Sequence, residues 1–111
     1  MDELLMSGLY ALKIQYVTGK SSFDANPGYL YRVDCSASDV TANLPSAEDV
    51  TDVPGGWLII KNVTGGNNVN VNPVSGETVD QQSSQQISGA DQGHSYLPCL
   101  RPSYGIGWIS W

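Results

Sequence analysis

The chain has 111 residues, only 14% of them charged, and a formal net charge of −6 at pH 7, so it has the length of one domain and an acidic balance. Its five Lys and Arg residues are spread without the basic patch that nucleic acid or an anionic membrane requires, and no segment approaches the roughly 20 apolar residues of a membrane span. The missing charges are replaced by 13 Ser, 5 Thr, 7 Asn, 6 Gln and 12 Gly, a composition that disfavours a helical protein, whose surface is normally rich in Glu, Lys and Arg.

Residues 1–8 are interpreted as an N-terminal arm, and residues 9–111 as a single β-sandwich domain. The arm carries two acids followed by the short apolar run Leu4, Leu5 and Met6, which differs from a secretory signal peptide. We therefore expect the protein to be made and folded in the cytoplasm of its producing cell.

The first half of the domain shows the two-residue period of half-buried strands. In residues 9–18 apolar side chains alternate with polar ones, which places Ile14 and Tyr16 on the side expected to be buried. The same alternation predicts strands at 29–35 and 39–44.

The segments between these strands have turn composition. Residues 19–28 are rich in Ser, Asp, Asn, Pro and Gly, which predicts a turn. Ser46 followed by Asp49 is typical of the start of a short helical turn. The Pro-Gly-Gly sequence at 54–56 then separates the two halves of the domain.

The second half begins with the most apolar segment of the chain, residues 57–63, which indicates a central strand. The Thr-Gly-Gly-Asn sequence at 64–67 predicts a hairpin loop, and the strict alternation in 68–72 predicts the returning strand. Further short strands are predicted at 77–80, around Ile87, at 95–101 and at 107–111.

Eight or nine short strands with turn signals about every 8–12 residues predict an all-β protein. The expected architecture is an antiparallel, jelly-roll-like β-sandwich. The spacing does not distinguish a jelly roll from another Greek-key arrangement.

The residues that carry chemistry do not form a recognisable constellation. The single histidine, His94, has no short-spaced Cys or His partner of the kind found in zinc sites. Cys35 and Cys99 are interpreted as small buried hydrophobes rather than as a disulfide. We therefore predict no metal site and no bound cofactor.

Two pairs of acidic residues are candidates for catalytic groups, because glycosidases use a pair of carboxylates. Glu48 with Asp49, and Glu77 with Asp80, both lie in predicted turns, where acidic side chains are common. No catalytic residue is predicted, and the protein is not expected to be an enzyme.

The tryptophans are the strongest candidates for burial or binding. Trp57 opens the most apolar strand and is expected in the core. Trp108 and Trp111 differ by three positions, so they point to opposite faces of a regular strand, one toward the core and the other toward an interface. An aromatic platform for sugar stacking is the alternative. The candidate interface residues are Leu4, Leu5, Met6, Trp108 and Trp111.

Several local patterns follow one another in the order of a known group of proteins. They are Tyr31-Arg-Val-Asp-Cys-Ser, Asp39-Val-Thr-Ala-Asn-Leu-Pro, Gly56-Trp-Leu-Ile-Ile-Lys-Asn-Val, Asn68-Val-Asn-Val-Asn-Pro, Gly76-Glu-Thr-Val-Asp and a final aromatic-Gly-Ile-Gly-Trp-Ile. This series resembles β-sandwich domains of phage virion proteins, which include tail-fibre and tail-spike accessory domains and capsid decoration proteins. The resemblance covers about residues 29–111.

Among these proteins, the chain is most similar to a capsid decoration (cement or staple) protein of a short-tailed double-stranded DNA phage, because it is short and has no heptad repeat. The resemblance implies a non-catalytic protein on the outer capsid surface of the virion, made in the bacterial host cytoplasm. Its partner would be the major capsid protein, whose subunit contacts it would stabilise, and a homo-oligomer is expected, with a dimer favoured. The alternatives are a tail-fibre or tail-spike accessory domain that binds host glycans and a secreted carbohydrate-binding module.

Overall fold

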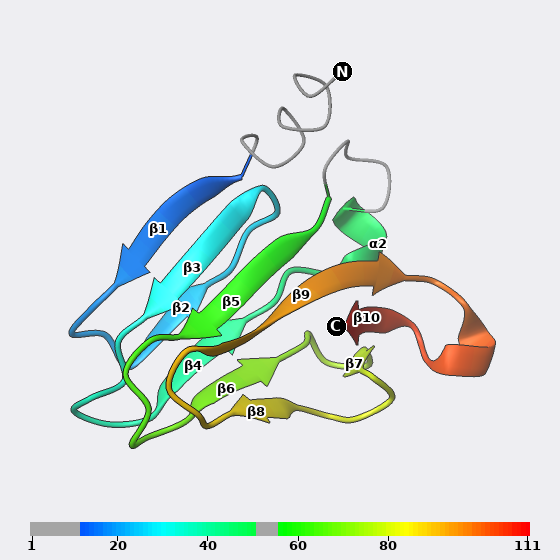
Figure 1. The fold of residues 1–111 in the computed structure, drawn as a ribbon. Helices are drawn as coiled ribbons and strands as arrows, with labels where there is room; N and C mark the ends of the chain where they lie inside the picture. The colour runs from blue at the N-terminus through cyan, green and yellow to red at the C-terminus, as the bar shows by residue number, and fades with distance from the viewer. Residues whose placement is uncertain (1–11, 51–55) are drawn as a thin grey trace.

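The computed structural model of the chain describes residues 12–50 and 56–111 (Figure 1). This part is built from ten strands, with one short α-helix and one 3-10 helix, so the all-β prediction is confirmed. The elements are β1 (Lys13–Val17), β2 (Ser22–Asp24), β3 (Tyr29–Val33), β4 (Val40–Asn43), α2 (Ala47–Val50), β5 (Leu58–Asn62), β6 (Val69–Asn72), β7 (Thr78–Val79), β8 (Gln85–Ile87), β9 (Gln92–Cys99), η1 (Pro102–Tyr104) and β10 (Gly107–Ser110). The predicted arm, residues 1–8, lies outside the described residues.

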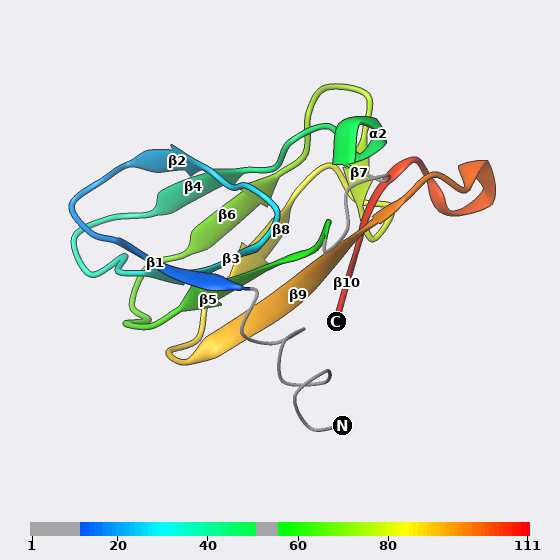
Figure 2. The ribbon, with the colours of Figure 1, turned by 90° about the horizontal axis from the view of Figure 1, so that it is seen from above.

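The strands form two sheets that lie face to face as two layers (Figure 2). One sheet has six strands in the order β1-β3-β5-β9-β10-β7, and the other has four in the order β2-β4-β6-β8. In β3, β4, β5 and β6 alternate residues point into the space between the layers, as the two-residue period predicts. The largest of the fully buried side chains are Trp108, Tyr96, Leu58, Ile60, Ile87, Val33, Val40, Val69 and Val71.

The first six strands alternate between the two sheets, so that each strand is followed by one in the opposite layer. β1, β3 and β5 stack in parallel in the six-stranded sheet, and β2, β4 and β6 stack in parallel in the four-stranded sheet. The chain therefore winds three times around the core. Each circuit brings the next strand beside the previous one in the same direction, which is why the neighbours are parallel.

The predicted antiparallel pairing is therefore wrong for most of the sandwich. Five of the eight strand pairs are parallel, and only β5 with β9, β9 with β10, and β6 with β8 are antiparallel. The predicted hairpin at 64–67 is also wrong, because β5 and β6 belong to different sheets and this turn carries the chain across the core. A jelly roll, whose neighbouring strands are antiparallel, does not describe the first six strands.

Two strands differ from their predicted positions. β2 lies within the predicted turn 19–28, and β9 begins at Gln92, before the predicted start of that strand at residue 95. The predicted helical turn after Ser46 is confirmed as α2. Its first backbone N–H, that of Ala47, donates to the Glu77 carboxylate (2.9 Å). The negative charge of Glu77 thus lies at the N-terminus of the helix, where the helix dipole favours it.

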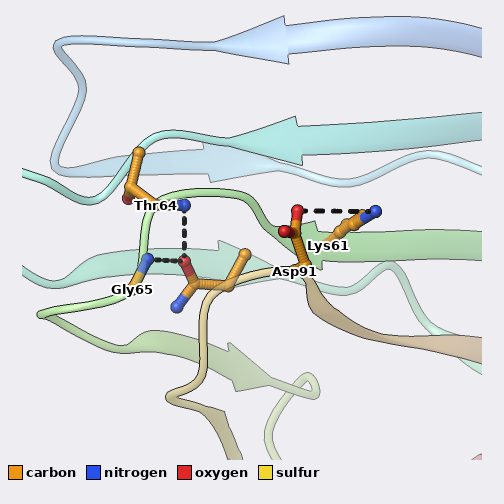
Figure 3. A network of polar contacts seen from close by, with 5 residues as sticks. Lys61, Thr64, Gly65 and Asp91 are labelled. Carbon is orange, nitrogen blue, oxygen red and sulfur yellow. Dashed lines mark hydrogen bonds and ion pairs between the residues drawn. The ribbon is translucent and has the colours of Figure 1, made fainter.

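The turn that crosses the core contains Thr64 and Gly65 (Figure 3). It is held together by Asn62, the last residue of β5. Its side chain is fully buried, and its amide oxygen accepts hydrogen bonds from the backbone N–H groups of Thr64 (3.2 Å) and Gly65 (2.8 Å). Its amide nitrogen donates to the carbonyl oxygens of Asn67 (3.1 Å) and Ile87 (2.9 Å). One side chain thus joins β5, the turn and β8.

The neighbouring strand and loops close around the same turn. The Cys35 thiol donates to the Asn62 amide oxygen (3.2 Å), and the Cys35 backbone N–H donates to the Thr64 hydroxyl (3.0 Å). Gly65 adopts a positive φ of 68°, and a Cβ there would lie 2.9 Å from the Ala90 backbone nitrogen. The turn therefore requires glycine at this position for both its conformation and its close contact.

We expect Asn62→Ala to lower the free energy of unfolding by about 3 kcal/mol or more, because it leaves several buried backbone groups without partners. Urea denaturation followed by tryptophan fluorescence measures this loss. Asn72→Ala is the matched control, since Asn72 lies on β6 with its side chain half-exposed, and we expect a change of about 0.5 kcal/mol or less. Equal losses in the two variants would contradict the central role of Asn62.

Candidate functional site

The outer surface of the six-stranded sheet is the candidate site. In β3 and β5 every second residue is buried, so the residues between them point away from the four-stranded sheet. The strand register extends this surface to β1, β9 and β10. We call it the outer apolar face, formed by Ile14, Tyr16, Leu30, Arg32, Ile59, Lys61, Leu97, Ile109 and Trp111.

One row of this face runs across the sheet from its β1 edge to β10. The register aligns Ile14 with Leu30, Leu30 with Ile59, and Ile59 with Ser95. The Trp111 backbone N–H donates to the Ser95 carbonyl oxygen (3.0 Å), which places Trp111 at the end of the row. The row is apolar except at Ser95.

Several of these side chains are unusually exposed for their size. The exposed fraction is 59% for Ile14, 69% for Tyr16, 38% for Ile109 and 74% for Trp111. These are four of the six large hydrophobic side chains that are exposed in the described part of the chain. Apolar side chains gathered on one face, rather than scattered singly, are typical of an interaction surface. The prediction that Ile14 and Tyr16 lie on a buried side of their strand is therefore wrong for the isolated chain.

The charges on this face are positive, although the chain as a whole is acidic. The Arg32 guanidinium lies over the Tyr16 ring, 5.9 Å from its centroid, a cation–π arrangement. Lys61 forms an ion pair with Asp91 (3.7 Å; Figure 3). Exposed pairs of this kind contribute only about 0–1 kcal/mol, so the apolar side chains dominate what the face offers to a partner.

The five candidate interface residues have different positions. Trp108 is 2% exposed, and its indole N–H donates to the Pro45 carbonyl oxygen (3.1 Å), so it belongs to the core and not to the exposed surface. Trp111 is on the outer apolar face, and the prediction that the two residues point to opposite faces is confirmed. Leu4, Leu5 and Met6 lie outside the described residues. Trp57 is half-buried just before β5 instead of deep in the core.

Two of the acidic residues considered for catalysis, Glu77 and Asp80, connect separate segments of the fold. Both carboxylate oxygens of Glu77 accept hydrogen bonds at the start of α2, from the Ser46 hydroxyl (2.9 Å) and the Ala47 N–H (2.9 Å). Asp80 accepts the backbone N–H of Ser110 (2.8 Å) and also the Ser110 hydroxyl. The two bonds of Asp80 hold the turn that follows β7 to β10.

A buried tyrosine lies beside this Asp80 group. Burial raises the pKa of the Tyr96 phenol well above its usual value, and the negative charge of Asp80 raises it further. The phenol therefore stays protonated at neutral pH and donates its hydrogen bond to the Gln85 amide oxygen. Such a group stabilises the packing of β8 against β9.

The histidine and the two cysteines also take part in the packing of the fold. His94 Nδ1 lies 2.7 Å from the Trp111 main-chain oxygen and so holds β9 to the residue after β10. Cys35 and Cys99 are buried free thiols, as predicted for small buried hydrophobes. Among the described residues, no three His, Cys, Asp or Glu side chains gather in a way that would hold a metal ion.

A polar hollow lies between the turns at 18–21 and 34–38. Its charged lining residues are Lys20 and Asp34. The Asp34 carboxylate accepts the Ser36 backbone N–H (2.9 Å), and this hydrogen bonding lowers the pKa of Asp34. The Asp34 carboxylate thus accepts a hydrogen bond within its own turn, which gives it a structural role.

In comparison with known proteins, no family model matches the chain, and no curated protein matches it. Within residues 12–50 and 56–111, no helix has the length and apolar character needed to span a membrane.

The two C-terminal tryptophans provide a direct test of this description. We expect Trp108→Ala to lower the free energy of unfolding by about 3–5 kcal/mol, because it leaves a cavity in the core. Trp111→Ala should change it by about 0.5 kcal/mol or less, because most of the ring is in solvent. Chemical denaturation followed by far-ultraviolet circular dichroism measures both. A large loss for Trp111→Ala would mean that this ring supports the fold of the isolated chain.

Proposed function

We propose that this protein is a non-catalytic structural protein of a phage virion, which binds the outer capsid shell and stabilises contacts between major capsid subunits. The observation that carries the proposal is the outer apolar face, which gathers the exposed side chains of Ile14, Tyr16, Ile109 and Trp111 on one sheet. The ordered sequence patterns between Tyr31 and Ile109, which resemble those of capsid decoration proteins, support the phage assignment.

The composition of the face fits binding by burial of apolar surface. Removing apolar surface from water stabilises a complex by about 25 cal/mol per Å². Ile109 and Trp111 expose such surface in the isolated chain and would lose it to a partner. Because few charges take part, binding of this kind depends only weakly on salt.

The proposal includes a location and partners. The protein would be made in the bacterial host cytoplasm, would reside on the outer capsid surface and would contact the major capsid protein. A homo-oligomer, with a dimer favoured, agrees with the symmetric arrangement of most protein assemblies. The role requires no enzyme activity and no cofactor.

A tail-fibre or tail-spike accessory domain that binds host glycans is the second candidate. The exposed rings of Tyr16 and Trp111 favour it, since amphipathic aromatic rings provide flat apolar surfaces beside a polar group. Both candidates use the outer apolar face, but they differ in the part of the virion that carries it.

Immunogold electron microscopy of the phage that encodes the chain separates the two. We expect an antibody against the purified protein to label the capsid shell at many positions, because a stabilising protein must repeat with the capsid subunits. Label confined to the tail would favour the second candidate. Virions without label anywhere would contradict both.

The face itself is tested by binding to capsids from a phage that lacks the gene. We expect Ile109→Ala with Trp111→Ala to weaken co-sedimentation with these capsids by at least about tenfold, which corresponds to about 1.4 kcal/mol. Val74→Ala is the matched control, because Val74 is also an exposed hydrophobic residue (36%) but lies in the turn after β6. Unchanged binding of the double variant would exclude this part of the face from the contact.

A further inference from the structure

The free edge of the six-stranded sheet is formed by β1 (Figure 1). Within residues 12–50 and 56–111, β1 pairs only with β3, on one side, and four of its five residues are exposed. The strands at the other three sheet edges, β2, β7 and β8, have three, two and three residues. β1 is therefore the longest edge available for pairing with another strand, and proteins normally cover or disrupt such an edge.

The hydrogen bonds of β1 identify which backbone groups are free. The Lys13 N–H donates to the Gly28 carbonyl (2.8 Å), and the Val17 carbonyl accepts from the Asp34 N–H (2.9 Å), so these two residues direct their backbone groups toward β3. Successive residues of a strand direct theirs to opposite sides. Ile14 and Tyr16 therefore present their N–H and C=O groups at the open edge.

We propose that β1 pairs in antiparallel orientation with β1 of a second copy of this chain, about a two-fold axis at Gln15. This register places Ile14 of each copy opposite Tyr16 of the other. These are the residues with free backbone groups, so the two Ile14–Tyr16 pairs exchange four hydrogen bonds. Gln15 meets Gln15 of the second copy between them, as the symmetry of an isologous dimer requires.

The side chains are compatible with this register. On the outer apolar face, the 59% exposed Ile14 lies beside the 69% exposed Tyr16 of the second copy, an aromatic and β-branched pair that is favourable in sheets. On the other face, Lys13 lies opposite Val17 of the second copy. No like charges meet across the edge, although each copy has a net charge of −6.

The pairing would join the two six-stranded sheets into one sheet and make their outer apolar faces continuous. This inference concerns the chain alone and does not depend on a role in the capsid. Dimer formation and capsid binding are measured separately, with substitutions at Gln15 for the dimer and at Ile109 and Trp111 for the capsid.

Sedimentation velocity of the full chain tests the dimer, and a charge exchange at Gln15 tests its register. We expect the wild-type chain to sediment as a dimer in the micromolar range. Gln15→Lys and Gln15→Glu should each sediment as monomers, because two like charges then face each other at the two-fold axis. An equal mixture of the two variants should form the mixed dimer, because the charges are now opposite.

Gln86→Lys and Gln86→Glu are the matched controls, because Gln86 is also an exposed glutamine in a strand but lies on the four-stranded sheet. Both should remain dimers, and circular dichroism should show the wild-type fold for all four variants. A wild-type chain that stays monomeric overturns the proposal. So does a dimer that persists in Gln15→Lys and Gln15→Glu, because the two copies would then meet through another surface.

Discussion

The fold depends on the hydrogen bonds of one buried amide, that of Asn62. A side chain without solvent contact must find partners for its oxygen and its nitrogen, and Asn62 finds them in the turn that follows it and in the Ile87 carbonyl. These bonds turn the chain out of the six-stranded sheet and toward the four-stranded one. The passage from β5 to β6, one of the crossings that bring parallel strands side by side, depends on this turn.

The two outer surfaces of the sandwich, one on each sheet, differ in composition. On the four-stranded sheet the outward residues of β4 and β6 are Thr41, Asn43, Asn70 and Asn72. On the six-stranded sheet the outward residues of β3 and β5 are Leu30, Arg32, Ile59 and Lys61, with Ile14 and Trp111 at either side. One surface is suited to water and the other to a partner. This difference between the layers, rather than any group of reactive side chains, is the feature that directs the proposed function.

The scarcity of charge has a related physical meaning. A surface of Ser, Thr, Asn and Gln is well solvated and adds no charge beyond the net −6 of the chain. The half-buried cations of the outer apolar face, Arg32 and Lys61, have a tyrosine ring and an aspartate beside them. The outer apolar face would therefore meet a neighbouring molecule mainly through its apolar side chains.

The sequence by itself determined the all-β class, the alternating faces of strands such as β4 and β6 and the opposite orientations of Trp108 and Trp111, because a period of two residues directly encodes which side chains share a face. It did not determine which face of β1 is buried, since Ile14 and Tyr16 are exposed. It did not reveal β2, whose three residues include only one apolar side chain, Phe23, and which is held by pairing with β4. Only the tertiary structure decided which sheet each strand joins and whether its neighbours are parallel. The physical reason is that parallel and antiparallel strands have the same two-residue period, so the direction of pairing depends on contacts between distant segments such as Asn62 and Ile87.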